Sequence, residues 1–290
     1  MRSLTSQQIA VMDFLDFVTK RHALYLVRAK GGPPPWTTDD IMNTYRFCNV
    51  YRELDRVTMF IRKKYTGNSP ALWFDLVVAR LLNEPWSLRQ LPVFSERVWD
   101  EKLFIAVLQA RQVDGDRVFN PAYIVSTNGR AMDKIEYLAK HVLTPMWGQQ
   151  GPNGALSLGR AHKQLMKFQG LGSFMAAQVV ADLKNTKGQA LQVAHDWWTW
   201  AAPGPGSLRG LNRIMGRGAV KTWPAGDPGW LTTLQKLQEH VHTRFDALGW
   251  KLLCAQDVQN CLCEFDKYER VRLGEGKPKQ LFRPRTAAST

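Results

Sequence analysis

Acidic and basic side chains lie close together in the segment FCNVYRELDR, residues 47–56. Asn49, Arg52 and Arg56 follow one another at steps of three and four, so on a helix they would share one face, with Asp55 at its edge. Guanidinium groups in such a row can bind phosphate, and a carboxylate in a cleft can accept a proton. The alternative is an exposed face of Arg–carboxylate pairs, each worth roughly a few tenths of a kcal/mol. The many apolar residues between these positions favour the cleft.

A second set of candidate residues lies in a glycine-rich turn within LMKFQGLGSFMAAQVVADL, residues 165–183. Gly170 and Gly172 can adopt positive φ without a Cβ penalty, and Ser173 is a suitable N-cap. These features predict a helix-hairpin-helix at 160–185, in which turn amides and a helix N-terminus can bind a DNA phosphate. The alternative is an ordinary corner between two helices.

An aspartate among tryptophans follows in HDWWTWAAPGPGSLRGLNR, residues 195–213, before a loop rich in glycine and proline. A phosphate-binding hairpin followed by an aspartate resembles the helix-hairpin-helix DNA glycosylases, in which the aspartate serves the flipped nucleotide. The spacing to Asp196 is longer here than in that pattern. The hairpin also has no lysine where lyase-type members carry their nucleophile, because Phe174 and Met175 follow Ser173.

The composition is that of a globular protein with a polyanionic partner. With 290 residues, 44% of them hydrophobic, the chain can bury a core as one large domain or two small ones. Lys and Arg number 39 against 25 Asp and Glu, a net charge of +14, which favours a nucleic acid over a merely solvated basic surface. The sequence has no signal-peptide pattern and no apolar run of about 18 residues. We therefore expect a soluble protein of the cytoplasm without membrane contact.

The cysteines do not have the spacing of a metal site. They are Cys48, Cys254, Cys261 and Cys263. This arrangement fits neither a CxxC pair nor a zinc ribbon, although a zinc ion recruiting His240 or His242 is the alternative. We expect free thiols, no metal and no cofactor.

Hydrophobic periodicity predicts an all-α fold. The expected helices cover 6–29, 39–64, 69–92, 95–113, 131–146, the hairpin, 230–247 and a segment from about 258. FNPAYIVSTNG, residues 119–129, is the best candidate for a strand or extended loop. We expect one helical domain over 1–278 and a flexible tail over 279–290.

Three segments together resemble a phage family of helical DNA-modifying proteins. They are FCNVYRELDR (47–56), the region from GLGSFMAAQVVADL to PGPGSLRGLNR, and CEFDKYERVRLGEGKPK (263–279). The family is that of the alpha-glutamyl/putrescinyl thymine pyrophosphorylases, or amino acid:DNA transferases, related to the helical domain attached to 5-hydroxymethyluracil DNA kinases. The resemblance spans about residues 39–279. It implies transfer of an amine, from an amino acid or a polyamine, onto pyrophosphorylated 5-hydroxymethyluracil in double-stranded DNA, with loss of pyrophosphate.

The implied reaction assigns a role to each candidate residue. Asp196 is the first candidate for the proton acceptor and Asp55 the second, with Arg52 beside it. The expected pyrophosphate-binding residues are Asn49, Arg56, Arg209, Arg213 and Lys267, with amides of the PGPGS loop. The expected DNA-binding residues are Gly170, Gly172, Ser173 and Trp197. No metal is assigned, and we expect the chain to act as a monomer.

The sequence contains no phosphate-binding loop of the form GxxxxGKS or GxxxxGKT. It therefore lacks the usual kinase mechanism and is expected to use an activated base made by another protein. Two other functions remain open, a helix-hairpin-helix glycosylase acting on a modified pyrimidine and a non-catalytic DNA-binding protein.

Overall fold

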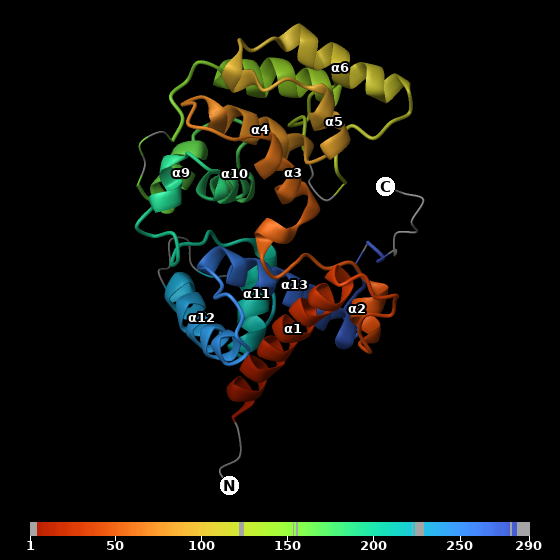
Figure 1. Ribbon diagram of the computed structural model, residues 1–290, viewed down its shortest axis with the longest axis vertical. Helices are drawn as coiled ribbons and strands as arrows, with labels where there is room; N and C mark the ends of the chain where they lie inside the picture. Colours follow the sequence, from red (N-terminus) through yellow and green to blue (C-terminus); the bar gives the residue numbers. More distant parts are fainter. Residues whose placement is uncertain are drawn as a thin grey trace. The chain divides into compact units, whose positions relative to one another are not determined.

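The computed structural model of the protein describes residues 5–121, 125–152, 154, 156–221, 223, 229–278 and 280–282 (Figure 1). Helices joined by turns and loops make up these ranges, which contain no β-strand, although an isolated bridge pairs Tyr45 with Leu281. The predicted all-α fold class is confirmed. The chain divides into two compact units: unit 1 comprises residues 1–55 and 203–290, and unit 2 comprises residues 56–202.

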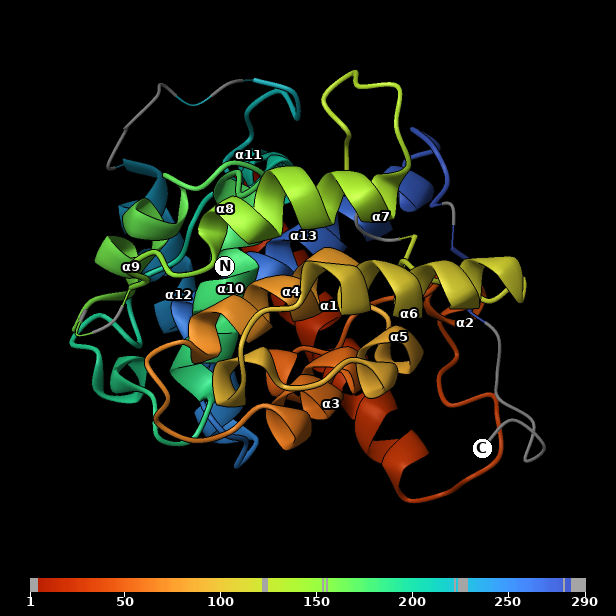
Figure 2. The same ribbon diagram turned by 90° about the horizontal axis from the view of Figure 1, so that it is seen from above.

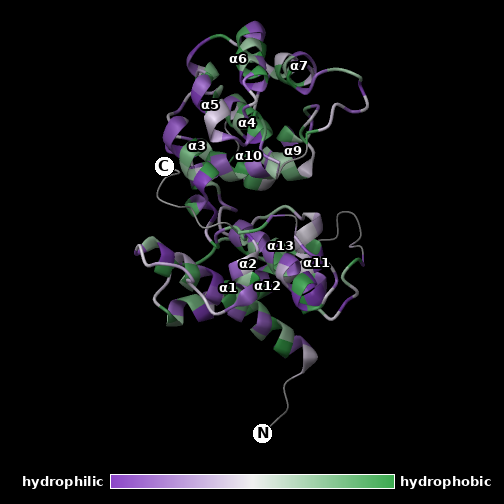
Figure 3. Cartoon of the chain, turned by 90° about the vertical axis from the view of Figure 1, so that its right-hand side faces the viewer, coloured by the Kyte–Doolittle hydropathy of each residue, from purple (hydrophilic) through white to green (hydrophobic). Residues whose placement is uncertain are grey.

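Unit 1 is built around α13 (Ala255–Arg272), against which the other α-helices of the unit pack (Figures 1 and 2). Its other elements are α1 (Ser6–Ala29), α2 (Asp40–Thr44), the short 3-10 helix η1 (Arg52–Leu54), α11 (Pro205–Ile214) and α12 (Gly229–Ala247). Hydrophobic and hydrophilic residues alternate along α1 (Figure 3), and its buried face places Phe14 edge-on to Phe265 of α13. The helices predicted at 6–29 and 230–247 are confirmed as α1 and α12.

Two glycines allow α11 to lie very close to α13. A Cβ at Gly210 would fall 2.2 Å from the carbonyl oxygen of Leu262, and one at Gly206 would fall 3.2 Å from Cys263. The PGPGS segment leads into α11, which Pro205 begins, so it is not the loop that the sequence predicted; pyrophosphate binding by its amides stays a prediction. The Gly204 amide donates to the Ser207 hydroxyl at 3.0 Å, so this amide is already used within the turn.

Unit 2 surrounds α4 (Leu72–Leu82), all of whose residues are buried. Its other elements are α3 (Arg56–Lys64), α5 (Pro85–Gln90), η2 (Phe94–Glu96), α6 (Glu101–Val113), α7 (Lys134–Tyr137), the π-helical segment η3 (Leu138–Leu143), α8 (Thr144–Met146), α9 (Leu158–Leu165), α10 (Ser173–Asn185) and η4 (Ala190–Val193). α10 packs along α4, where Arg80 donates to both carboxylate oxygens of Asp182 at 2.5 Å. This buried ion pair joins the two central helices.

Several predicted helices of unit 2 have different boundaries in the structure. The helix predicted over 69–92 is interrupted at Asn83, which adopts a left-handed φ of 49°, and it restarts at Pro85. The helix predicted over 95–113 begins only at Glu101, because Asp100 caps it by accepting the Leu103 amide. The candidate strand at 119–129 has no strand in its described part, and residues 122–124 lie outside the described residues.

Candidate functional site

The segment 45–55 of unit 1 is an extended loop, so the helix predicted over 39–64 is wrong. α2 ends at Thr44, Tyr45 is extended, and helical structure resumes only in η1 and α3. Asn49, Arg52 and Arg56 therefore do not share a helix face. Arg56 is exposed at the start of α3 in unit 2.

Side chains from two helices take over the hydrogen bonds that a helix would have made in this loop. Arg21 of α1 donates to the carbonyl oxygens of Phe47 and Cys48, each at 2.9 Å, and Lys267 of α13 donates to that of Arg46 at 2.8 Å. Buried backbone carbonyls need such partners, and these tertiary donors stabilise the extended conformation. The loop is consequently held in place from both sides.

Asn49 is the centre of this polar network. Its side-chain oxygen accepts from Arg21 at 3.1 Å, its amide nitrogen donates to the Leu54 carbonyl at 2.8 Å, and its backbone carbonyl accepts from Asn260 of α13 at 3.3 Å. All these groups are satisfied within the protein. Asn49 therefore positions the loop, whereas the sequence predicted that it would bind pyrophosphate.

Asp55 is the half-buried carboxylate at the end of the loop. Its Oδ1 accepts the Asn49 N–H at 3.0 Å, and among the described residues its other oxygen has no hydrogen-bond donor. Burial raises the pKa of the Asp55 carboxyl, and the nearby Glu264 charge adds to this, while the Asn49 N–H and the charges of Arg52 and Arg21 oppose it. A carboxylate with a raised pKa and an oxygen that accepts no hydrogen bond is suited to accept a proton.

Arg52 and Asp55 were expected to pair directly, and the described residues show no such ion pair. Arg52 begins η1, and its backbone N–H donates to Oδ1 of Asp257 on α13 at 3.2 Å. The Arg52 charge still lowers the pKa of Asp55 through space. The interaction observed between the two side chains is therefore a through-space electrostatic one.

Lys267 and Glu264 connect the loop to α13. Glu264 accepts the Cys48 N–H at 2.9 Å and the Lys267 ammonium at 2.5 Å. The Lys267 ammonium also lies 4.7 Å from the Phe47 ring centroid. Lys267 is a predicted pyrophosphate-binding residue whose observed contacts hold the loop.

A second group of unit 1 gathers three arginines around one carboxylate. Asp266 of α13, which is fully buried, pairs with Arg209 at 2.8 Å, with Arg213 at 3.0 Å and with Arg270 at 3.5 Å. Arg213 also pairs with Glu275, which lies after α13. We call Arg209, Arg213, Arg270 and Asp266 the arginine cluster.

The arginine cluster carries more positive charge than its buried carboxylate can neutralise. Arg209 uses only its Nε on Asp266, and among the described residues its terminal nitrogens have no partner. Its side chain is 34% exposed and that of Arg270 is 37% exposed. Both guanidiniums therefore remain accessible to an anion, and pyrophosphate binding by Arg209 stays a prediction.

In unit 2, the helices α9 and α10 are joined by the loop 166–172. Gly170 has a φ of +87°, and a Cβ there would lie 2.9 Å from Val142, so this position requires glycine. Gly172 has a φ of −69° and a Cβ there would meet open space. The prediction of positive φ is confirmed for Gly170 and wrong for Gly172.

The N-terminus of α10 has no side-chain cap. Its N-cap residue is Gly172, and Ser173 is the first helical residue, so the prediction of a Ser173 cap is wrong. The Ser173 hydroxyl instead contacts Nε2 of His162 on α9 at 3.3 Å. Because Gly172 has no side chain, no side-chain hydrogen bond caps the first turn of α10.

Asp196 caps α9, the other helix of this pair. It accepts hydrogen bonds from the Leu158 amide at 2.7 Å, the Ser157 hydroxyl at 2.8 Å and the Gly159 amide at 3.1 Å. Ser157 itself caps the Arg160 amide at 3.2 Å. The start of α9 is thereby capped by side chains, whereas the N-cap of α10 makes no side-chain hydrogen bond.

Trp197 lies next to Asp196 and packs on α10. Its indole N–H donates to the Lys184 carbonyl at 3.4 Å, and the Lys184 ammonium lies 4.0 Å from the ring centroid. The neighbouring Trp198 is 46% exposed. Trp198 is thus the more accessible aromatic residue in this segment.

Sequence reasoning overlooked Arg21, Glu264, Asp266 and Arg270. Arg21 does carry a recognisable signal, because it occupies the apolar stripe of α1 formed by Phe14, Phe17, Val18 and Leu24. A charged residue inside such a stripe has to find buried partners.

The described part of the chain has neither a metal-binding cluster nor a membrane-spanning helix. No group of three or more His, Cys, Asp or Glu side chains there is arranged to hold a metal ion. No helix there is both long and apolar enough to cross a membrane.

Comparison with known proteins gives one family and one relative. The family model described as "5-hmdU DNA kinase, helical domain" matches residues 8–278. The 5-hmdU DNA kinase of Bacillus phage SP10 is 27% identical over 238 residues, which cover 73% of this chain and 37% of that protein. The chain thus spans well under half of this relative. No solved structure matches the chain.

Proposed function

Because this chain belongs to the 5-hmdU DNA kinase helical-domain family, we propose that it modifies 5-hydroxymethyluracil in phage DNA by replacing an activated hydroxyl group with an amine. The relative is a kinase by name, whereas this sequence has no phosphate-binding loop of the kinase type. The chain would therefore consume a base that another enzyme has pyrophosphorylated.

The arginine cluster is the observation that carries this proposal. A leaving pyrophosphate carries several negative charges, and Arg209 and Arg270 can meet them with guanidinium donors already held by Asp266. Preorganised donors stabilise charge as it develops, without reorganisation during the reaction. A surface that bound only the DNA backbone would have no need for a buried carboxylate that organises three arginines.

Asp55 is the proposed proton acceptor. The amine nitrogen would attack the methylene carbon attached to C5 of the uracil, and the carbon–oxygen bond to pyrophosphate would break, with its electron pair leaving on the pyrophosphate oxygen. The nitrogen would pass its proton to the oxygen of Asp55 that has no donor. A carboxyl group with a raised pKa holds such a proton better than an ordinary one.

Asp196 remains the alternative proton acceptor. Its three hydrogen bonds occupy both oxygens, so accepting a proton would weaken the cap of α9. We therefore assign it the role of a positioning residue that fixes the segment bearing Trp197 and Trp198. The glycosylase hypothesis also depends on this aspartate and is less favoured for the same reason.

The start of α10 is the proposed DNA contact. Gly172 is not required by its own backbone conformation, and its Cα faces open space. A glycine of this kind permits close approach of a phosphate to the first-turn amides. The resulting contact would be independent of base sequence and sensitive to salt.

The deciding experiment uses DNA that contains pyrophosphorylated 5-hydroxymethyluracil. The protein is incubated with this DNA and with glutamate, glycine or putrescine, and the products are digested to nucleosides for mass spectrometry. We expect an amine adduct and stoichiometric pyrophosphate, both strongly reduced in Arg209→Ala. An abasic site would instead establish a glycosylase, and unchanged nucleosides with intact DNA binding would leave only a DNA-binding function.

A further inference from the structure

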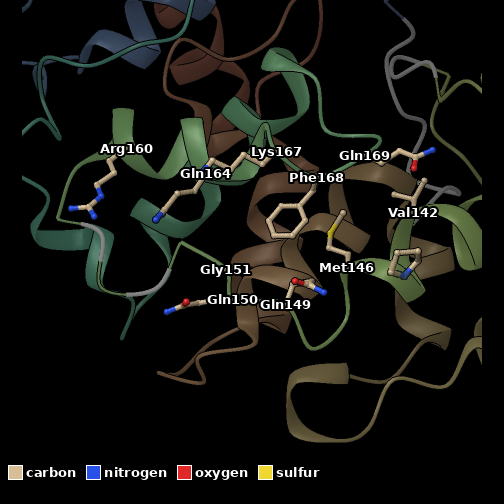
Figure 4. A pocket seen from close by; sticks show the side chains of 11 residues that line it. Val142, Met146, Gln149, Gln150, Gly151, Arg160, Gln164, Lys167, Phe168 and Gln169 are labelled. Atoms are coloured by element: carbon tan, nitrogen blue, oxygen red, sulfur yellow. The ribbon is translucent and has the colours of Figure 1, made fainter.

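A pocket of about 700 Å³ opens in unit 2 beside the loop that joins α9 to α10 (Figure 4). Arg160 and Gln164 reach it from α9, Lys167 and Phe168 from the start of the loop, and Met146 from α8. Volumes of a few hundred to a thousand cubic ångströms are typical of small-molecule and cofactor sites. The proposed mechanism makes no use of this pocket.

Phe168 forms a firmly supported aromatic wall. It stacks on the buried Trp73, with ring centroids 5.0 Å apart and planes at 25°. Gly151 packs closely against the same indole, because a Cβ there would fall 2.2 Å from the Trp73 indole nitrogen. Figure 4 shows the Phe168 ring among the labelled side chains of the pocket. A ring fixed in this way provides a surface for a planar ligand.

Gln164 lines the pocket and carries an unsatisfied polar atom. Its side-chain oxygen is buried and has no hydrogen-bond partner among the described residues. An unsatisfied buried acceptor costs free energy that a ligand donor would recover. Because the amide group carries both donors and an acceptor, it matches the edge of a nucleobase.

The charge of the pocket indicates an anionic ligand. None of its lining residues is acidic, while Arg160 and Lys167 are both exposed at it. A polyamine would find no counter-charge here. An amino acid would find cations, but it would fill only a small part of the volume and would make no use of the aromatic wall.

We propose that this pocket receives one unpaired nucleotide of a DNA strand bound at the α9–α10 loop. The base would lie against Phe168 with its edge on Gln164, and the flanking phosphates would pair with Arg160 and Lys167. This inference rests on the DNA-binding part of the proposed function and not on amine transfer. It assigns a nucleotide subsite to unit 2, whereas Asp55 and the arginine cluster belong to unit 1.

Photo-crosslinking tests the proposal directly. Single-stranded DNA with one 4-thiothymidine is bound to the full chain, irradiated and digested, and the modified peptide is identified by mass spectrometry. We expect the adduct within residues 160–169. Substitutions Gln164→Met and Phe168→Leu should each reduce this adduct at least about fivefold, as expected for the loss of a stacked or hydrogen-bonded base. Lys167→Ala should reduce it as well.

Lys163→Ala is the matched control, because Lys163 lies on α9 and does not line the pocket. It should leave the adduct unchanged, and Gln164→Met should unfold at the same or a higher denaturant concentration than the parent. Three results obtained while the strand is bound would overturn the proposal. They are an adduct outside residues 160–169, no adduct at all, and an adduct that these substitutions do not reduce.

Two competition experiments distinguish a bound DNA strand from a free nucleotide and from an amino acid. Micromolar free thymidine 5′-monophosphate that abolishes the adduct would show a free-nucleotide site, and competition by glutamate would show an amino-acid site; either result overturns the strand assignment. A strand that does not bind at all, measured by fluorescence anisotropy, overturns the DNA-binding premise as well. Amine transfer is tested separately by the nucleoside digestion.

Discussion

Asp55 of unit 1 differs from three hydrogen-bonded carboxylates of unit 2. In unit 2, Asp182 is paired through both oxygens with Arg80, Asp75 accepts the Phe94 and Ser95 amides at 2.8 Å, and Asp196 accepts three hydrogen bonds. In unit 1, Asp55 accepts a single hydrogen bond among the described residues. Burial raises the pKa of both Asp55 and Asp75, so hydrogen bonding and not the pKa distinguishes them.

This difference separates structural from chemical roles. A carboxylate that accepts hydrogen bonds on both oxygens holds those donors in place, whereas one with an oxygen that accepts none can take part in proton transfer. The arginines follow the same division. Arg80 is completely enclosed by its partners in unit 2, while Arg209 keeps exposed donors in unit 1.

The largest effect is expected from Asp55→Asn, which removes the proposed proton acceptor and keeps its shape. Transfer of the amine should fall by about 10² to 10⁴, as is typical when a general base is lost. The measurement is single-turnover adduct formation on pyrophosphorylated DNA. A rate within a few-fold of the parent would remove Asp55 from the mechanism and make Asp196 the leading candidate.

The pH dependence gives an independent check on Asp55. Its carboxyl must be ionised to accept a proton, so a raised pKa moves the acid limb of the rate profile above the ordinary value of 3.8, and Asp55→Asn should lack that limb. The same raised pKa stabilises the folded state at acid pH, and this contribution is lost as the pH rises through it. The parent should therefore lose stability relative to Asp55→Asn above that pH.

The second largest effect is expected on the stability of unit 2, from the substitution Asp182→Asn. Asp182→Asn removes the negative charge that faces the buried Arg80 guanidinium, which also donates to Thr58 at 3.0 Å and to Asn83 at 3.3 Å. Breaking a buried ion pair from one side typically costs about 3–5 kcal/mol of unfolding free energy, measured here by urea denaturation. The double variant Arg80→Met with Asp182→Leu should recover most of it. A stable Asp182→Asn protein without activity would contradict the structural role.

The sequence predicted the long elements of the fold well. α1 and α12 match their predicted ranges because their apolar periodicity is long and uninterrupted. The helix predicted across 45–55 failed because its competing partners are distant in sequence. Arg21 and Lys267 lie on helices far from the loop, and no local pattern reveals that their donors replace helical hydrogen bonds.

The candidate site was only partly predictable for the same reason. Residue type, which reflects chemistry directly, was enough to propose Asp55, Arg209 and Arg213 as candidates. Asp266 was passed over within a dense charged segment, because its role depends on α11 lying close to α13 through Gly210. Residue type can indicate a possible role, but whether a hydrogen-bonding capacity is already used depends on tertiary contacts.

A smaller effect is expected from Asp196→Asn. One carboxylate oxygen becomes an NH₂ group facing donors at the start of α9, so the cap is weakened by about 1 kcal/mol, as is usual for capping changes. We expect a modestly lower melting temperature, near-normal DNA binding and transfer reduced only a few-fold. A loss of transfer comparable to that of Asp55→Asn would show that unit 2 also supplies a chemical group, and the division between the units would fail.

The smallest effect tests whether the arginine cluster holds a spare anion site. Glu275 lies on the guanidinium of Arg213, and this contact lowers the pKa of Glu275. A pyrophosphate that approaches the cluster must compete with the carboxylate.

Glu275→Gln should therefore bind inorganic pyrophosphate about two- to fivefold more tightly, the range of a partly exposed ion pair, as measured by calorimetry. Glu239→Gln on α12 makes the same change in net charge and should have little effect. Equal gains in both variants would attribute the change to overall charge. Weaker binding in Glu275→Gln would mean that Glu275 positions Arg213, and the anion site would then have to be formed by Arg209 and Arg270 alone.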